Sequence, residues 1–156
     1  MDKNKSAYKL KGFKPYIINL DGEPDRWNWC KEQLDYWEIT DYTRISAYDG
    51  RPNEGSDLGE ILKGKYPDSV SSGEIGCVTS HLKAIKHFYE ETDDPYAVIM
   101  EDDCDINIAK YWTFTFRQFM SRVPYDWDVV QLAIICPGEL HVNIHRRFIN
   151  DFSTAC

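Results

Sequence analysis

The stretch Tyr96-Ala-Val-Ile-Met100 is an apolar run that leads directly into the acidic run Glu101-Asp-Asp-Cys-Asp105. Five consecutive apolar residues have the length and composition of a buried strand. In an open parallel sheet, ligands bind outside the carboxyl ends of the strands. The carboxylates that follow this run are therefore expected at the edge of the sheet where a ligand would lie.

Strands and helices alternate along the chain on both sides of this stretch. Short apolar runs predict further strands at residues 15–20, 42–47 and 128–135. Apolar residues at helical spacing predict helices over residues 23–37, 71–91 and 110–123. This alternation predicts an α/β fold with an open, mostly parallel sheet and helices on both of its faces.

The second of these helices has the clearest beginning. Ser71 and Glu74 form a capping-box pattern, in which each side chain bonds the backbone N–H of the other residue. The run Thr92-Asp-Asp-Pro95 ends the helix. Between these signals, one apolar stripe follows helical spacing through Ile75, Val78, Leu82, Ile85 and Phe88 or Tyr89.

Length and composition are those of a single folded domain. The chain has 156 residues, of which 42% are hydrophobic and 14% aromatic, so it can form a core and is not disordered throughout. Its net charge of −8 argues against nucleic-acid binding through a broad basic surface. The longest apolar runs have about five residues, against the ~20 that a transmembrane helix needs. We therefore expect no nucleic-acid partner and no transmembrane segment.

The charge is unevenly distributed between the N-terminus and the rest of the chain. Residues 1–15 hold five lysines against one acid. We interpret residues 1–14 as a basic N-terminal arm, either a solvated tail or a contact for anionic lipid or substrate, and residues 15–156 as the domain. The arm has no apolar segment of a secretory signal, which predicts a cytoplasmic protein.

The number and spacing of the cysteines also favour a cytoplasmic protein. They number five and lack CxxC spacing, so we interpret them as small buried hydrophobic residues in a reducing compartment. They are Cys30, Cys77, Cys104, Cys136 and Cys156.

Carboxylates at the end of a buried strand predict a metal site. In extended backbone, Glu101, Asp103 and Asp105 share one side and Asp102 faces the other. Two carboxylates ~5 Å apart repel by roughly 3 kcal/mol at an effective dielectric constant of about 20, and a bound divalent cation would offset this repulsion. Oxygen ligands favour Mn²⁺ or Mg²⁺. The alternative is an acidic turn whose charges point into water.

A divalent cation suits an acidic protein that binds an anionic substrate, because it can clamp a diphosphate and neutralise a departing phosphate oxygen. This predicts chemistry on a phosphate or nucleotide-linked substrate. Arg26, at the start of a predicted helix, suits a diphosphate or a pyrimidine edge, or else pairs with Asp25 or Glu23. Asp49, before Gly50, accepts a ribose hydroxyl or shapes the turn.

Five blocks resemble glycosyltransferase family 25 in their order and approximate spacing. They are Tyr16-Ile-Ile-Asn-Leu-Asp21 with Asp25-Arg26, Arg44-Ile-Ser-Ala-Tyr-Asp-Gly50, Ser72-Gly-Glu-Ile-Gly-Cys-Val-Thr-Ser-His-Leu82, Val98-Ile-Met-Glu-Asp-Asp103 and Asp126-Trp-Asp-Val-Val-Gln-Leu132. The family includes lipooligosaccharide sugar transferases and collagen galactosyltransferase domains. The resemblance implies a GT-A-like fold, a nucleotide-sugar donor such as UDP-galactose and Mn²⁺ dependence. It also implies transfer to a saccharide or other hydroxyl-bearing acceptor, with inversion at the anomeric carbon.

The resemblance also implies roles for individual residues. Asp103 matches the acid that ligates the metal, and Glu101 is placed to contact ribose, or the metal through water. Asp105, on the same side of the extended run, is the third predicted metal ligand. For Ser80 and His81, which lie inside a helix, ordinary packing is the alternative. The predicted donor-binding residues are Asn19, Arg26, Asp49, Gly50, Ser80, His81, Glu101 and Asp102.

The chain departs from the family pattern in two respects. Gly22-Glu-Pro24 stands where many members carry a second basic residue, and members usually continue well beyond this length. We therefore expect a chain truncated at its C-terminus, in which the base that deprotonates the acceptor is not assigned. The sequence does not determine the sugar, the acceptor or the oligomeric state.

Two other functions stay open at this point. One is a non-catalytic nucleotide-sugar-binding or partner module on the same fold, suggested by the short C-terminus. The other is a receiver-like domain that holds Mg²⁺ around a phospho-aspartate. The second is disfavoured, because the acids follow the third strand rather than the first and no lysine partner follows a late strand.

Overall fold

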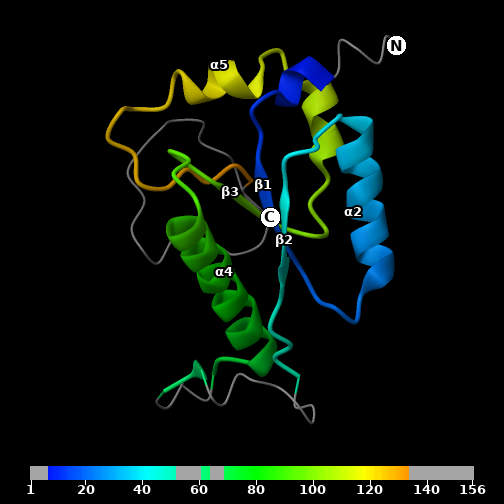
Figure 1. The fold of residues 1–156 in the computed structure, drawn as a ribbon, viewed down its shortest axis with the longest axis vertical. Coiled ribbons are helices and arrows are strands. Elements are labelled where there is room, and N and C mark those ends of the chain that lie inside the picture. The colour runs from blue at the N-terminus through cyan, green and yellow to red at the C-terminus, as the bar shows by residue number, and fades with distance from the viewer. Residues whose placement is uncertain (1–6, 52–60, 64–68, 134–156) are drawn as a thin grey trace.

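Three parallel strands form the sheet of the computed structural model, which describes residues 7–51, 61–63 and 69–133. β1 (Pro15–Asn19) lies between β2 (Thr43–Ser46) and β3 (Val98–Glu101) (Figure 1). In the register, Ile18 of β1 lies opposite Ile45 of β2 and also opposite Glu101 of β3. Because the strands are parallel, they end at one common edge. The predicted α/β fold with a parallel sheet is confirmed.

Helices cover both faces of this sheet, as predicted. Ile17 of β1 belongs to the larger hydrophobic core, on the face covered by α2 (Pro24–Tyr36). Ile18 and Ala84 belong to a second core, on the face covered by α4 (Ser72–Glu91). Successive residues of β1 therefore alternate between two cores, and the whole strand is buried. Figure 1 shows α2 and α4 on opposite sides of the strands.

α4 begins where the capping box predicts it. The Glu74 N–H donates to Ser71 Oγ at 3.2 Å, and Glu74 Oε2 accepts from the Ser71 N–H at 2.8 Å. The apolar stripe that predicts this helix is nevertheless largely exposed, with Leu82 59% and Val78 47% exposed. The residues that α4 buries are small or polar: Gly76, Thr79, Ser80 and Ala84.

α4 buries small residues because its backbone lies very close to the loop that follows β2. A Cβ atom added to Gly76 would lie 2.7 Å from the backbone nitrogen of Gly50 and 2.8 Å from the carbonyl oxygen of Tyr48. Large apolar side chains on this face of the helix would hold the two backbones apart. Small residues therefore face the sheet along most of α4, and Val78, Leu82 and Ile85 face outward. Near the C-terminal end of the helix, Phe88 packs against the second core.

The chain after β3 differs from the prediction in two places. A continuous helix over 110–123 is wrong: the structure has the 3-10 helix η2 (Ile106–Tyr111) and the short helix α5 (Phe116–Met120). α5 has its own capping box, in which Thr115 Oγ1 accepts from the Gln118 N–H, so a new helix begins there. The predicted strand at 128–135 is also wrong where it can be compared, because residues 128–133 carry no strand. Residues 134–135 lie outside the described residues.

Residues 7–14 of the predicted basic arm pack against the domain. They include the 3-10 helix η1 (Tyr8–Leu10), and Leu10 and Phe13 are buried in the larger core. Lys9 Nζ donates to two backbone carbonyls at the end of η2, each at 2.7 Å. Residues 1–6 lie outside the described residues. Among the helices of the described ranges, none is long and apolar enough to cross a membrane.

Candidate functional site

A buried hydrogen bond joins the carboxyl ends of β1 and β3. Asn19, the last residue of β1, is 1% exposed, and Asp102, which follows β3, is 4% exposed. Asn19 Nδ2 donates to Asp102 Oδ2 at 2.6 Å. The Asp102 backbone N–H also donates to the carbonyl of Ile18 at 3.1 Å, so the pairing of β1 with β3 extends to this residue. Both predicted donor-binding residues thus meet at the carboxyl edge of the sheet.

Arg26 provides the cation for this buried carboxylate. It lies in the first turn of α2, and its Nη2 lies 2.5 Å from Asp102 Oδ1 and 2.8 Å from Asp103 Oδ2. The side chain of Arg26 is 45% exposed and that of Asp103 is 58% exposed. Arg26 therefore links a buried acid to one that solvent or a ligand can reach.

Arg44, on β2, completes the network. Its Nε donates to Asn19 Oδ1 at 2.9 Å, and its Nη2 donates to Asp21 Oδ1 at 2.7 Å. Ser46 Oγ donates to Asp21 Oδ2, and the hydrogen bonds from Ser46 and then Arg44 lower the pKa of Asp21 below its usual value. Because both ends of the Asn19 amide are occupied, its orientation is fixed.

A cavity of about 270 Å³ opens beside this network, lined by Asp25, Arg26, Trp29, Asp102 and Asp103. Trp29 lies one turn along α2 from Arg26 and is 41% exposed. A guanidinium suits a phosphate, and an indole face suits a base or a sugar ring. A cavity of about 390 Å³ lies elsewhere, beside η1 and residues 37–41. It is remote from the carboxyl ends of the strands, so we take the cavity beside Arg26 as the candidate site.

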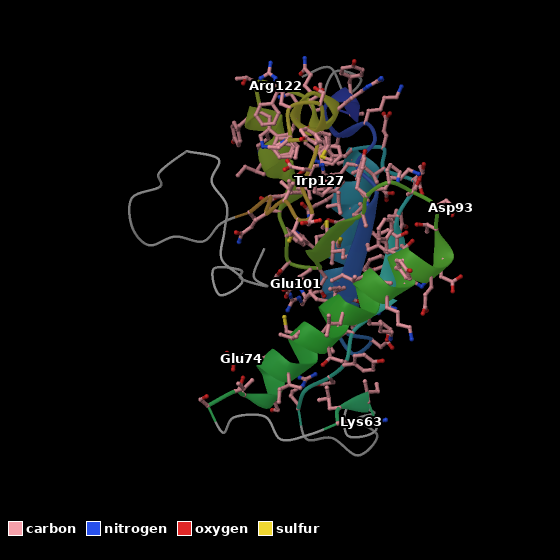
Figure 2. All side chains as sticks on the ribbon, turned by 90° about the vertical axis from the view of Figure 1, so that its left-hand side faces the viewer. Lys63, Glu74, Asp93, Glu101, Arg122 and Trp127 are labelled. Atoms are coloured by element: carbon pink, nitrogen blue, oxygen red, sulfur yellow. The ribbon has the colours of Figure 1, made fainter. Side chains whose placement is uncertain are left out.

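Glu101 and Asp102 point to opposite sides of β3, as alternation along a strand predicts. Glu101 Oε1 lies 3.2 Å from His81 Nε2 and 3.7 Å from Cys77 Sγ, and both of these residues belong to α4. Figure 2 labels Glu101 at the end of β3, beside α4. The structure therefore brings together His81 and Glu101, but on the face away from Arg26.

The three predicted metal ligands do not meet at one point. Asp103 pairs with Arg26, and Asp105 caps η2 by accepting a hydrogen bond from the Asn107 N–H at 3.0 Å. The cause is that β3 ends at Glu101 and a turn follows, so the two-residue alternation stops there. Within the described ranges, the one group of three Cys, His, Asp or Glu ligand atoms lying within 4.8 Å of one another belongs to Cys77, His81 and Glu101.

Ser80 lies inside the protein and joins α4 to the loop after β2. It is 1% exposed. Its Oγ donates to the carbonyl of Gly76 at 2.6 Å and accepts from the backbone N–H of Tyr48 at 2.8 Å. The structure therefore places Ser80 in the packing of this loop, outside the cavity beside Arg26.

Gly50 and Asp49 belong to the same loop. A Cβ atom on Gly50 would lie 1.8 Å from the carbonyl oxygen of Ser72, so the backbone of the loop rests directly on the start of α4. Asp49 accepts hydrogen bonds from the backbone N–H and the guanidinium of Arg51. Neither residue lines the cavity beside Arg26.

Comparison with known proteins identifies the family of the chain. The family model of glycosyltransferase family 25, described as an LPS biosynthesis protein, matches residues 13–124. The chain belongs to glycosyltransferase family 25. Neither the comparison with curated proteins nor that with solved structures gave a match. Family 25 membership makes the chain a glycosyltransferase, and the matched residues include the whole network around Asn19.

Sequence reasoning missed two residues of this family 25 chain that the structure brings to the carboxyl edge. Arg44 lies opposite Ile17 in the register and therefore on the same face as Asn19, but a register is not visible in a single sequence. Cys77 precedes His81 by four residues, a spacing that places both on one helix face. That spacing was a usable signal, because cysteine and histidine are both zinc ligands and residues four apart on a helix lie close enough to share an ion.

Proposed function

We propose that this chain transfers a hexose, such as galactose, from a UDP-sugar to a hydroxyl group of an acceptor, with inversion at the anomeric carbon. The observation that carries the proposal is the Asn19–Asp102–Arg26 network, which lies beside a cavity at the carboxyl edge of the sheet. This is the edge at which open α/β sheets bind their ligands. Family 25 membership supplies the reaction class.

Arg26 is the group suited to the diphosphate of the donor. Its guanidinium already binds two carboxylates at the cavity, and it is exposed enough to exchange the outer one, Asp103, for phosphate oxygens. Asp102 holds the guanidinium in place from inside the protein, and the hydrogen bond from Asn19 holds Asp102. Trp29 offers a flat apolar surface for the base or the sugar ring.

The proposed cation is Mn²⁺ or Mg²⁺, held by Asp103. The three carboxylates predicted as ligands are not gathered, but these ions are commonly held by one or two carboxylates together with substrate phosphates and water. Asp103 fits this simpler arrangement, because it is exposed and borders the cavity. When bound, the cation would neutralise negative charge on the departing diphosphate. A GT-A-like fold and a cytoplasmic location stay predictions.

Calorimetric titration of UDP-galactose and UDP-glucose with and without Mn²⁺ tests this proposal. We expect binding that requires Mn²⁺, and a loss of about tenfold or more in affinity for Asp103→Asn, which corresponds to about 1.4 kcal/mol. Asp93→Asn is the matched control: it removes an equal charge at an exposed position beyond the C-terminal end of α4, and affinity should not change. Equal binding with and without Mn²⁺, or an unchanged Asp103→Asn variant, would contradict the role of the cation.

A second measurement separates a transferase from a protein that only binds the donor. With Mn²⁺ and an acceptor alcohol present, a transferase releases UDP and forms a glycoside, both of which are detected by NMR. Donor binding without either product would favour the non-catalytic module that the sequence leaves open.

A further inference from the structure

Three side chains with metal-binding atoms meet where the end of β3 faces α4. The atoms are a sulfur, a nitrogen and an oxygen. Cys77 and His81 lie one turn apart on α4, and Glu101 is the last residue of β3. Their ligand atoms all lie within 4.8 Å of one another. Sγ of Cys77 is 3.7 Å and Nε2 of His81 is 3.2 Å from Oε1 of Glu101.

These separations match those around a tetrahedral zinc ion. Zinc lies about 2.3 Å from a thiolate sulfur, about 2.0–2.1 Å from an imidazole nitrogen and about 2.0–2.2 Å from a carboxylate oxygen. At tetrahedral angles, the sulfur and oxygen ligands are then about 3.6 Å apart, and the nitrogen and oxygen ligands about 3.4 Å apart. The two observed distances, 3.7 Å and 3.2 Å, differ from these values by no more than about 0.2 Å.

We propose that Cys77, His81 and Glu101 bind Zn²⁺, with a fourth coordination position open to water or another ligand. A thiolate and an imidazole select zinc over Mn²⁺ and Mg²⁺, which prefer oxygen ligands. Three protein ligands with one open position are typical of zinc sites that bind a substrate or water, rather than of closed structural sites.

The surroundings allow an ion to reach this site. The side chains of His81 and Glu101 are 18% and 25% exposed, and Cys77 is also partly exposed. Cys30, by contrast with Cys77, is fully buried. Burial, with a smaller contribution from the charge of Asp102, raises the pKa of the Cys30 thiol to about 11. The Cys30 thiol therefore stays protonated inside the core, whereas Cys77 lies at the partly exposed surface of α4 beside Glu101.

The proposed zinc site is separate from the donor site. Glu101 and Asp102 are neighbours in the chain, but their side chains leave β3 on opposite faces, one toward α4 and the other toward Arg26 on α2. The zinc proposal therefore does not depend on the proposed function, and either can fail without the other.

Titration of the full chain with Co²⁺, under a phosphine reductant, tests the site. Cobalt adopts the coordination of zinc and is coloured, so we expect intense visible bands of tetrahedral Co²⁺ and a sulfur-to-cobalt charge-transfer band in the near ultraviolet. One equivalent of Zn²⁺ should remove both. Cys77→Ser should remove the charge-transfer band. His81→Gln should weaken Co²⁺ binding by more than about tenfold, since the loss of even an outer partner costs about 10- to 100-fold.

Matched controls keep the result specific to these residues. Cys104→Ser and His87→Gln change the same residue types, Cys104 in the turn after β3 and His87 farther along α4, and should leave the bands unchanged. Circular dichroism shows whether each variant is folded, and His81→Gln decides the outcome if Cys77→Ser does not fold. Absence of the charge-transfer band in the wild-type chain, or its persistence in folded Cys77→Ser, would overturn the proposal.

Discussion

An Arg26→Gln variant is expected to lose about 3 kcal/mol of unfolding free energy, because it leaves the carboxylate of Asp102 buried without its cation. Asp102 is 4% exposed, and Arg26 Nη2 lies 2.5 Å from its Oδ1. Removal of one partner of a buried ion pair costs about 3–5 kcal/mol, and the lower end applies here because Arg26 itself is 45% exposed. Chemical denaturation at neutral pH measures the loss.

Arg51→Gln is the matched control for this prediction. It removes the same charge from an exposed pair, since the Arg51 side chain is 61% exposed, and it should cost no more than about 1 kcal/mol. The double variant Arg26→Gln/Asp102→Asn removes the buried charge as well and should be more stable than Arg26→Gln alone. Equal losses for Arg26→Gln and Arg51→Gln would show that the buried pair is not the cause.

A Gly76→Ala variant is expected to destabilise the protein by about 2–3 kcal/mol, although the same change inside most helices stabilises by up to about 1 kcal/mol. The added Cβ would lie 2.7 Å from Gly50 N and 2.8 Å from Tyr48 O. These are backbone atoms that cannot rotate aside, so α4 or the loop must move. Thermal and denaturant unfolding both report the change.

Gly73→Ala provides the control within the same helix. The nearest atom to its added Cβ would be the Ser71 hydroxyl oxygen at 3.9 Å, which is ordinary contact. This variant should be neutral or more stable than the wild type by up to about 1 kcal/mol. If Gly76→Ala matched Gly73→Ala in sign and size, the close approach of α4 to the loop after β2 would be refuted.

Much of the sheet and the start of α4 could be predicted because the local signals agree with the fold. β1 is buried on both faces, and a strand of this kind reads as a continuous apolar run between turn residues. The Ser71–Glu74 capping box acts within one turn, so it is visible without any knowledge of the rest of the molecule. The packed face of α4 depends instead on a contact 26 residues away, between Gly76 and Gly50, and periodicity carries no information about it.

The sequence predicts at which edge of the sheet the candidate site lies, but not how its side chains are arranged there. The topological rule predicts that Asn19 and Asp102 lie at one edge, and the structure brings them to 2.6 Å. The directions of Asp103 and Asp105 could not be predicted, because they depend on where β3 ends, and strand ends are the least certain part of a sequence-based assignment. The position of Arg44 beside Asn19 could not be predicted either, because it depends on the strand register, which is set by tertiary packing.

In the proposed function, the donor and its cation bind beside Arg26, Trp29 and Asp103. Mn²⁺ is paramagnetic and broadens the NMR signals of nearby protons, so it reports its own position. The indole N–H groups of Trp29 and Trp37 make a sensitive pair, because Trp29 lines the cavity beside Arg26 and Trp37 lines the cavity beside η1.

The most direct test is therefore a titration of the full chain with Mn²⁺ in the presence of UDP, in which the two indole N–H signals are recorded by NMR. We expect the Trp29 signal to broaden at clearly lower Mn²⁺ concentrations than the Trp37 signal, because Trp29 lines the cavity beside Arg26. Asp103→Asn should abolish this difference. Equal broadening of the two signals, or broadening of Trp37 before Trp29, would contradict a cation bound beside Asp103.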